Sequence, residues 1–271
     1  MSTRVLVTGG ASGLGRAIAE RFARSGARVC VADVDEDRGR EVTSTLASSR
    51  GEALFQRCDV RRDEDLEGAR DALVAAWGGV DVVVNNAGVA LAGPVEVVSM
   101  DDWRWIVEIN LLGVVRGCRT FTPLFKAQRS GHFVNVASMA GLLDVPFMSA
   151  YNATKAAVVS LSETLQNELA DDGVAVSVVC PSFFQTNIAA NMRTPDPGLR
   201  AVTEKLLARS RLTAADVADD VYEAVRDRRF YVLSHEDGRA AWMLKRLLPR
   251  PLYARVMRRQ ARSMRRAATA R

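Results

Sequence analysis

Seven short apolar runs alternate with longer stretches of helical periodicity, and this alternation constrains the fold more than any other feature of the sequence. Several of the runs are continuously apolar and rich in β-branched residues, which is typical of strands buried on both faces of a parallel sheet. A strand–helix–strand order favours right-handed crossovers that put helices on both faces of such a sheet. We therefore predict an α/β fold with a doubly wound, seven-stranded, mostly parallel sheet. The expected strands cover residues 3–9, 27–33, 52–60, 80–86, 132–138, 174–181 and 229–234.

Helical periodicity fills the segments between these runs, most clearly over 13–26, 63–77, 103–121 and 153–173. Asp101 or Asp102 is expected to cap the third of these helices, and Gly173 is expected to end the fourth in a left-handed conformation.

The length of 271 residues fits one large domain. We expect this domain to occupy residues 1–240 and to include a lid over about 182–212. Residues 241–271 then form a C-terminal extension.

A glycine-rich turn, 8-TGGASGLG-15, follows the first expected strand and opens a helix. Glycines at this place permit positive φ and let backbone N–H groups approach a phosphate, toward which the helix also points its positive end. The spacing departs from the common G-x-G-x-x-G pattern, and a tight turn without a ligand would also explain it. The turn predicts a Rossmann-type dinucleotide site that includes Gly9, Ser12, Gly13, Leu14 and Gly15.

Asp33 ends the second expected strand, about 20 residues after the turn, where a carboxylate can accept hydrogen bonds from an adenosine ribose. The same charge would repel a 2′-phosphate, and neither Val34 nor Ser12 supplies a cation to pair with one. We therefore predict NAD rather than NADP, while a turn-capping role for Asp33 stays open. Asp59, followed by Val60, could contact the adenine edge or cap its own turn.

Taken together, these motifs resemble the single-domain short-chain dehydrogenase/reductase family. The resemblance covers roughly residues 1–235 and depends on a combination of motifs that occur in the family's order. They are 8-TGGASGLG-15, 85-NNAG-88, Asn110, Ser138, 151-YNATK-155 and 181-PSFFQT-186.

Tyr151 and Lys155 stand four residues apart, so they share one face of a helix. A free phenol has a pKa of about 10, and a nearby ammonium lowers it toward the range of a useful base. The resemblance implies that Tyr151 is the general acid/base, that Lys155 also binds the nicotinamide ribose, and that Ser138 binds the substrate oxygen. It further implies that Asn110 holds a water molecule linked to the lysine.

The family resemblance assigns two more loops to the cofactor. It implies that Asn86, Ala87 and Gly88 lie beside the adenosine portion, and that Pro181 and Thr186 contact the nicotinamide side. Ser182 stands where the family usually has glycine. If this position needs a positive φ, Ser182 would be mildly strained.

Mostly apolar residues follow these loops, and we expect Ala140, Leu142 and Phe183 to contact substrate beside Ser138 and Tyr151. The pattern favours an apolar secondary alcohol or ketone, of lipid, steroid or alicyclic type, as the substrate of an NAD(P)-dependent oxidoreductase. The same residues could instead simply pack a lid. A non-catalytic protein that senses a dinucleotide, or a scaffold at a lipid surface, remains an alternative function.

The C-terminal extension is strongly basic. Ten of the 37 basic residues lie from Lys245 onward, where there is no acidic residue, so the rest of the chain has five more acidic than basic residues. The pattern after Pro251 predicts a basic amphipathic helix that lies on a membrane surface, docks on an acidic subunit surface, stays solvated or binds nucleic acid weakly. We expect no specific nucleic-acid partner. The apolar positions of this predicted helix are Leu252, Tyr253, Val256, Met257 and Met264.

The remaining composition indicates a cytosolic protein, with peripheral contact at the inner membrane face as an option. No run of about 18 apolar residues is present. The four cysteines show no CxxC spacing and are expected to be buried thiols, and the two histidines have no partner at metal-ligand spacing, so we expect no metal site. Family members commonly form homodimers or homotetramers, which the resemblance implies here too.

Overall fold

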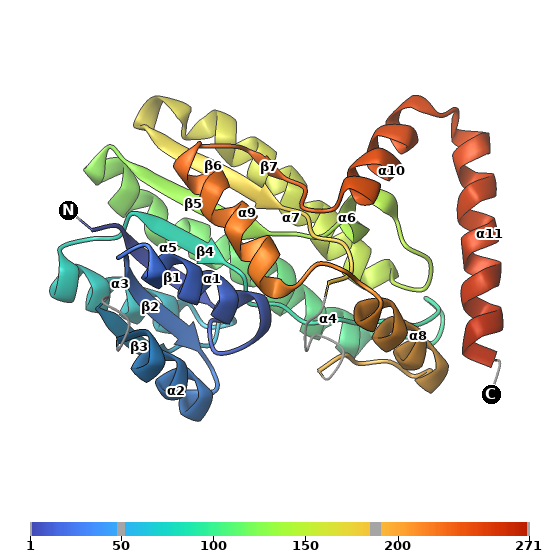
Figure 1. Cartoon of the computed structure of the whole chain (residues 1–271), viewed down its shortest axis with the longest axis horizontal. Coiled ribbons are helices and arrows are strands. Elements are labelled where there is room, and N and C mark those ends of the chain that lie inside the picture. Colours follow the sequence, from blue (N-terminus) through green and yellow to red (C-terminus); the bar gives the residue numbers. More distant parts are fainter. Residues whose placement is uncertain (1, 48–51, 185–190, 270–271) are drawn as a thin grey trace.

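Seven parallel strands form one sheet in the computed structural model, which describes residues 2–47, 52–184 and 191–269. The strand order is β3-β2-β1-β4-β5-β6-β7 (Figure 1), so the chain runs outward from β1 and then returns to β4 at its other side. This confirms the predicted sheet, although the last strand has only two residues. The strands are β1 (Arg4–Thr8), β2 (Arg28–Asp33), β3 (Ala53–Arg57), β4 (Val82–Asn85), β5 (Gly131–Val136), β6 (Val174–Val179) and β7 (Tyr231–Val232).

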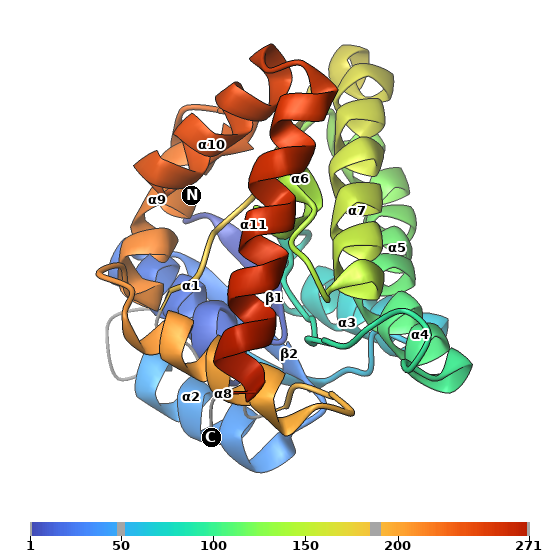
Figure 2. The ribbon, with the colours of Figure 1, turned by 90° about the vertical axis from the view of Figure 1, so that its right-hand side faces the viewer.

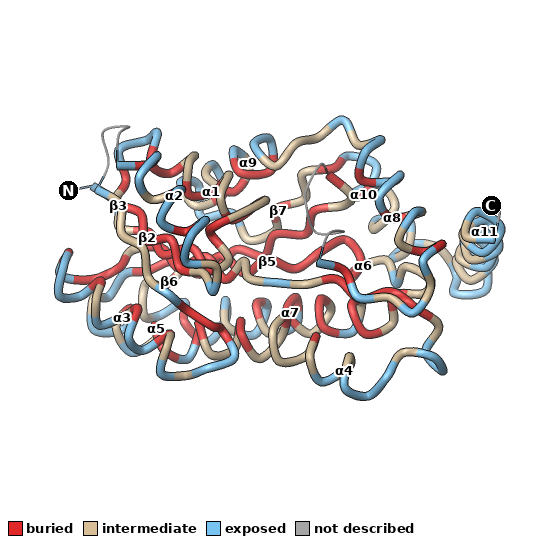
Figure 3. The backbone as a smooth tube through the Cα atoms, turned by 90° about the horizontal axis from the view of Figure 1, so that it is seen from below, coloured by how far each residue is buried: buried red, intermediate tan, exposed pale blue. Residues whose placement is uncertain are grey.

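Helices cover both faces of the sheet, as predicted. Figure 3 shows α1, α2 and α9 on one side of the buried strands and α3, α5 and α7 on the other. The α-helices are α1 (Gly13–Arg24), α2 (Glu36–Ala47), α3 (Asp63–Trp77), α4 (Met100–Val107), α5 (Gly113–Gln128), α6 (Ala140–Leu143), α7 (Ser149–Glu168), α8 (Pro197–Ala208), α9 (Ala214–Arg226), α10 (Glu236–Leu247) and α11 (Arg250–Thr269).

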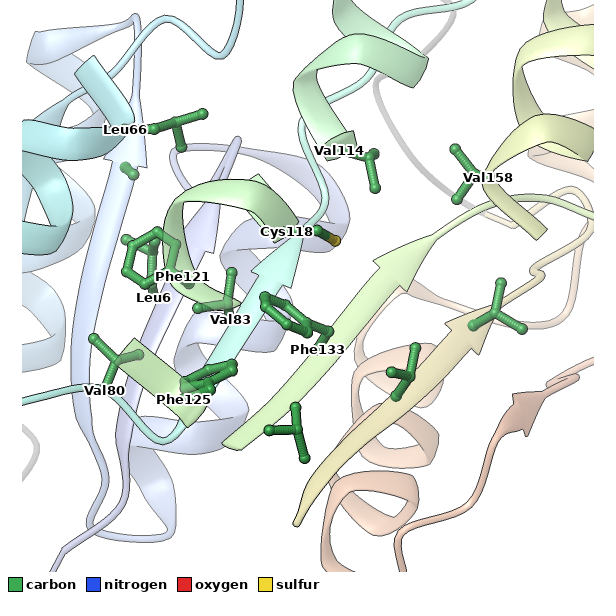
Figure 4. Close-up of a cluster of buried hydrophobic side chains, with 14 of the residues drawn as sticks. Leu6, Leu66, Val80, Val83, Val114, Cys118, Phe121, Phe125, Phe133 and Val158 are labelled. Atoms are coloured by element: carbon green, nitrogen blue, oxygen red, sulfur yellow. The ribbon is translucent and has the colours of Figure 1, made fainter. Parts of the chain in front are cut away.

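Each face of the sheet has its own hydrophobic core, because successive side chains of a strand point to opposite faces. Val5 and Val7 of β1 pack in the cluster that includes α1 and α9, whereas Leu6 packs in the cluster that includes α3 and α5. Figure 4 shows this second cluster, in which the rings of Phe125 and Phe133 have centroids 4.8 Å apart. Burial on both faces explains the continuous apolar runs of the sequence. All four cysteines are buried free thiols, as expected.

Two helix ends test the capping predictions. Gly173 adopts a φ of 74° at the end of the short 3₁₀ turn η2 (Ala170–Asp172) that follows α7, which confirms its left-handed role. The expected cap at Asp101 or Asp102 is wrong, because α4 begins one turn earlier and the Ser99 side chain accepts the N–H of Asp102. The two aspartates instead occupy the first turn, where their negative charges favour the helix dipole.

The helix expected over 103–121 is interrupted. Residues Glu108–Leu112 form a π-helical turn, η1, between α4 and α5. A π turn widens the helix by one residue and rotates the side chains that follow, and such turns are frequent at functional sites. Asn110 lies in the middle of this turn.

Helices α10 and α11 follow β7, and α11 crosses one side of the molecule in front of α6 and α8 (Figure 2). Near its start, Tyr253 Oη donates a hydrogen bond to the carbonyl oxygen of Leu143 at 2.6 Å. Near its end, the carbonyl oxygen of Ala268 lies 2.3 Å from where a Cβ atom at Gly198 of α8 would stand. We call α11 the C-terminal strap. Among the described helices, none combines the length and apolar character needed to span a bilayer.

We expect Gly117→Ala to lower the free energy of unfolding by about 1–3 kcal/mol, as overpacking in a core typically does. A Cβ atom at Gly117 of α5 would lie 2.0 Å from Oδ1 of the buried Asn85. Urea unfolding followed by circular dichroism measures the change.

Gly68→Ala is the matched control, since Gly68 is also inside a helix but has nothing within 4 Å of a Cβ atom. It should raise stability by about 0.5–1 kcal/mol through helix propensity. Equal effects of the two substitutions would contradict the packing argument.

Candidate active site

A cavity of about 820 Å³ opens at the carboxyl ends of the strands. Its lining residues come from the segments that follow six strands, from Gly9 after β1 to Pro181 after β6. The chain leaves β1 and β4 in opposite directions along the sheet, and the crevice between their loops is where open α/β sheets place a ligand. The topology therefore positions the predicted motifs around one cavity.

The glycine turn after β1 adopts the backbone conformations that its residues predict. Gly9 and Gly13 have φ values of 64° and 53°, in the left-handed region. A Cβ atom at Gly15 would lie 2.1 Å from the carbonyl oxygen of Gly9, so only glycine lets the turn close. Gly9, Ser12, Gly13 and Leu14 line the cavity, whereas Gly15 does not and acts through the shape of the turn.

Asn86, after β4, fastens this turn to the neighbouring strand. Its Nδ2 donates hydrogen bonds to the carbonyl oxygens of Thr8 and Gly9, at 2.9 and 3.1 Å. Its backbone N–H donates to Oγ1 of Thr8 at 3.0 Å. Asn86, Ala87 and Gly88 all line the cavity, in the place that the sequence predicts for them.

Asp33 lies at the cavity edge with its carboxylate held by the backbone. Its two oxygens accept the N–H groups of Ala11 in the glycine turn, at 2.9 Å, and of Asp35, at 3.1 Å. Asp59 and Val60 also line the cavity. Oδ1 of Asp59 accepts the N–H of Arg61 at 3.0 Å, so the turn-capping role that was left open for Asp59 is present.

Two cations at this end of the cavity were missed by the sequence analysis. Arg38 and Arg61 both line it, whereas the sequence analysis looked for a cation only at Ser12 and Val34. Each is paired with a nearby carboxylate, Arg38 with Asp35 at 3.5 Å and Arg61 with Asp59 at 2.9 Å. The only signal in the sequence is the short spacing between each arginine and its carboxylate. Ordinary surface ion pairs have the same spacing, so it does not predict that these arginines line a cavity.

Ser138, Tyr151 and Lys155 meet at the other end of the cavity and all line it. Tyr151 and Lys155 lie in the first two turns of α7, and Nζ of Lys155 is 5.8 Å from the centre of the Tyr151 ring. Lys155 Nζ donates to the carbonyl oxygen of Val136 at 2.7 Å, and Ser138 Oγ accepts the N–H of Ala140 at 3.1 Å. The predicted one-faced arrangement is thus present, and all three side chains are buried.

Burial sets the proton affinities of this group. It raises the pKa of Tyr151, and a hydrogen bond with Ser138 opposes that rise. Burial lowers the pKa of Lys155 to about 8, since the ammonium has lost most of its hydration. The sequence analysis expected the ammonium to lower the pKa of Tyr151, but in this structure the loss of solvent raises it.

Asn110 does not reach the cavity. It is fully buried in η1, where its Oδ1 accepts the N–H of Val89 at 2.8 Å and its Nδ2 donates to the carbonyl oxygen of Val89 at 2.9 Å. A Cβ atom at Gly88 would lie 3.3 Å from Asn110 Oδ1 and 3.5 Å from Lys155 Nζ. Asn110 therefore holds the strand-end loop that separates it from Lys155.

Apolar side chains dominate the cavity near Tyr151. Ala140 and Phe183 line it, as the sequence predicts, together with Trp105, Leu143 and Met148. Leu142 does not line it and is instead buried in the core cluster beside α7, whereas its neighbour Leu143 lines the cavity. The single turn of α6 explains this, because adjacent residues of a helix point in different directions. Gln260 of the C-terminal strap lines the cavity as well.

The loop after β6 is held by a histidine that the sequence analysis left without a role. The backbone N–H of Ser182 donates to Nδ1 of His235 at 3.2 Å, and Nε2 of His235 donates to the carbonyl oxygen of Phe183 at 3.0 Å. This pattern requires the neutral ring with its proton on Nε2. Ser182 is not among the described residues with positive φ, so the expected strain is not present. Pro181 lines the cavity, and Thr186 lies outside the described residues.

Within 2–47, 52–184 and 191–269, no group of three His, Cys, Asp or Glu side chains is placed to hold a metal ion.

Comparisons with known proteins agree with this geometry. A sequence profile of the short chain dehydrogenases matches residues 3–197. The probable oxidoreductase EphD of Mycobacterium tuberculosis is 34% identical over 259 residues, which are 92% of this chain and 44% of EphD. The chain thus spans less than half the length of that relative.

Two further proteins match over most of their length. The 3beta-hydroxysteroid dehydrogenase 1 of Eggerthella lenta is 35% identical over 232 residues, covering 84% of this chain and 88% of that protein. A crystal structure of a short chain dehydrogenase/reductase from Burkholderia phymatum in complex with NAD superposes with a TM-score of 0.86. It is 36% identical and covers 90% of this chain and 93% of its own.

We expect His235→Ala to raise the KM for a nicotinamide dinucleotide more than it lowers kcat, because it removes both hydrogen bonds that hold residues 182 and 183. Each such bond is worth about 1 kcal/mol, which corresponds to roughly fivefold in affinity. His235→Asn keeps an acceptor near the Nδ1 position, so its KM should lie between those of the wild type and His235→Ala. Initial-rate kinetics with the dinucleotide varied measure the effect.

His132→Ala is the control. His132 is also buried but bonds to Ser177 in the sheet and does not line the cavity. It should lower stability without changing the KM. Matching kinetic changes in the two alanine variants would reduce His235 to a general stabilising residue.

Proposed function

The chain belongs to the short-chain dehydrogenase family, and on this premise we propose that it is an NAD-dependent oxidoreductase that interconverts a secondary alcohol and a ketone on an apolar substrate. One observation carries the proposal: Ser138 and Tyr151 line the same cavity as the glycine turn and Asp33. A group that can transfer a proton and a turn that can hold a dinucleotide therefore share one cavity.

Tyr151 acts as the general acid/base in this proposal. During ketone reduction its phenol gives a proton to the substrate oxygen, and during alcohol oxidation the phenolate takes that proton back. Ser138 and Tyr151 line the same cavity, so the serine hydroxyl is placed to bind the same substrate oxygen. The buried ammonium of Lys155, 5.8 Å from the ring, favours the phenolate whenever it forms. Asn110 keeps the Val89 segment in position.

The residues at the opposite end of the cavity suit a nicotinamide dinucleotide, which when bound supplies the hydride acceptor or donor. Left-handed glycines leave room for a diphosphate at the start of α1, where the helix dipole favours negative charge. The held carboxylate of Asp33 suits a ribose diol. We propose that the dinucleotide is bound by Gly9, Ser12, Gly13, Leu14, Asp33, Asp59, Val60, Asn86, Ala87, Gly88, Tyr151, Lys155, Pro181 and Thr186, with Gly15 shaping the turn.

Charge favours NAD over NADP in this proposal. A 2′-phosphate beside the ribose would meet the carboxylate of Asp33. Arg38 and Arg61 also lie at this end, but each is already paired with a carboxylate, Asp35 and Asp59 respectively. Both arginines are well exposed, so these pairs contribute little to the choice, and the preference for the 2′-hydroxyl rests on the carboxylate of Asp33.

The apolar wall near Tyr151 supports an apolar substrate. Trp105, Leu143, Val145, Met148, Phe183 and Leu206 offer it few hydrogen-bonding groups. One relative is named for a 3β-hydroxysteroid, so steroid and alicyclic secondary alcohols are the first substrates to screen. We further propose a homodimer or homotetramer, as family members commonly form, and contact of residues 251–271 with a surface outside the active site.

We expect Tyr151→Phe to lower kcat at least a hundredfold while leaving the affinity for NADH within about twofold, since general acid/base catalysis is typically worth 10²–10⁴ in rate. Turnover of a steroid and alicyclic alcohol panel and NADH fluorescence titration measure the two quantities. Tyr222→Phe, in α9, is the matched control and should keep full activity. Unchanged turnover by Tyr151→Phe would contradict its role as general acid/base, and no turnover by either protein would favour the non-catalytic alternative.

The wild-type protein should show opposite pH dependences in the two directions. Burial raises the pKa of Tyr151, so its phenol stays protonated at neutral pH. Ketone reduction uses the protonated form and should be faster at about pH 7 than at about pH 10, whereas alcohol oxidation should gain rate as the pH rises. Profiles of kcat/KM in both directions test this, and parallel profiles would contradict the role of Tyr151.

We expect Asp33→Asn to shift the affinity ratio of NADPH to NADH by about tenfold toward NADPH, the effect of roughly 1.4 kcal/mol. The amide removes the negative charge but can still accept the N–H of Ala11. Fluorescence titration of both reduced dinucleotides gives the ratio. Asp37→Asn, which removes a charge from the exposed first turn of α2, should leave the ratio unchanged. The same ratio in wild type and Asp33→Asn would remove Asp33 as the selector.

A further inference from the structure

The corner between α10 and α11 exposes an unusual concentration of apolar side chains. Of the eleven large apolar side chains that are exposed among the described residues, five lie between Met243 and Val256. Leu247 is the most exposed of all, at 76%. We call this set the apolar corner; it consists of Met243, Leu244, Leu247, Leu252 and Val256.

This corner is held in place, so its exposure is not that of a frayed end. Nζ of Lys245 donates to the carbonyl oxygen of Leu142 and to Oδ2 of Asp144, both at 2.6 Å. Tyr253 Oη donates to the carbonyl oxygen of Leu143. The two anchors lie on either side of Leu247, and both join the corner to α6 and the residue that follows it. The apolar corner therefore projects from a fixed base.

The strap divides its apolar residues between two directions. Tyr253, Met257 and Met264 are half-buried along the side that faces the body, at the helical spacing of one face. That side also brings Gln260 to the cavity. Leu252 and Val256 remain exposed, at 44% and 51%. The amphipathic face expected from the sequence is thus used mainly for packing within the chain, and the apolar corner is what stays free.

Arginines occupy the outward side of the strap. Arg255, Arg258, Arg259 and Arg262 line one shallow surface hollow, and Arg266 follows one turn later. All five are exposed. From Lys245 onward the sequence has no acidic side chain that could neutralise them. Guanidinium groups bind phosphate oxygens in a forked geometry, so this arginine face suits a surface of phosphate groups.

The combination of the two features selects one kind of partner. A nucleic acid would use the arginine face but would leave the projecting apolar corner in water. A lipid surface uses both, because headgroup phosphates pair with the arginines while the apolar side chains enter the acyl boundary. We propose that the apolar corner and the arginine face dock this protein on an anionic lipid surface. Docking brings the lipid layer to the helix that lines the substrate end of the cavity, where an apolar substrate would enter if the proposed function holds.

Vesicle flotation of the full chain tests the proposal without any assay of turnover, so its outcome is independent of the proposed function. We expect the protein to float with vesicles of phosphatidylcholine containing about one third phosphatidylglycerol, to stay behind with phosphatidylcholine alone, and to bind less as salt rises. Equal flotation with both vesicle types, or none with either, would overturn the proposal.

Two variants separate the contributions. Leu247→Ser with Leu252→Ser should weaken binding roughly tenfold, as should Arg255→Gln with Arg259→Gln and Arg262→Gln. Matched controls change exposed residues elsewhere: Val95→Ser with Val97→Ser, and Arg62→Gln with Arg104→Gln and Arg226→Gln. Unchanged melting temperatures and circular dichroism spectra establish that every variant is folded.

Alternative partners give different results. If the apolar-corner variant changes the oligomeric mass measured by light scattering while wild type does not float, the corner is a contact between copies of this chain and the proposal is wrong. If the arginine variant loses binding to a labelled DNA duplex of arbitrary sequence and wild type does not float, the arginine face binds nucleic acid and the proposal is equally wrong.

Discussion

The side chain of Asn86 links the two strands on which the candidate site depends. Its amide donates to the carbonyl oxygens of Thr8 and Gly9, and its own backbone N–H donates to Thr8. These bonds fasten the loop after β4 to the glycine turn after β1, at the point where the sheet order reverses. A crevice between two loops would otherwise be free to vary in width. The position of the glycine turn relative to the loop after β4 depends on that fixed spacing.

Burial then decides the chemistry at the other end of the cavity. Tyr151 and Lys155 are buried, with Lys155 held against β5 and the loop after β4. Burial raises the pKa of the phenol and lowers the pKa of the ammonium to about 8. A neutral phenol can donate a proton, whereas a phenolate cannot. The protonation state of a lysine with a pKa of about 8 is easily changed by any charge that enters the cavity. The same enclosure that excludes water thus leaves the pair responsive to what binds beside it.

Most of the sheet and the catalytic candidates could be predicted because they depend on local patterns. Continuous apolar runs identify buried strands, glycines identify the left-handed turn, and spacing places Tyr151 and Lys155 on one face. Other features depend on contacts between distant segments. No local signal predicts the π turn at Asn110 or the bonds of His235 to residues 182 and 183. Nor does one predict that Leu143 rather than Leu142 lines the cavity.

The sequence by itself determined the order of strands and helices, the residue types of the candidate site and the basic charge of the C-terminal segment, because each of these is a property of neighbours along the chain. Tertiary structure alone decided where that segment lies and which of its faces is free. The strap packs Tyr253, Met257 and Met264 against the body and leaves Leu252, Val256 and the arginines outside. An amphipathic pattern specifies that a face will be buried, but only the rest of the molecule determines what buries it.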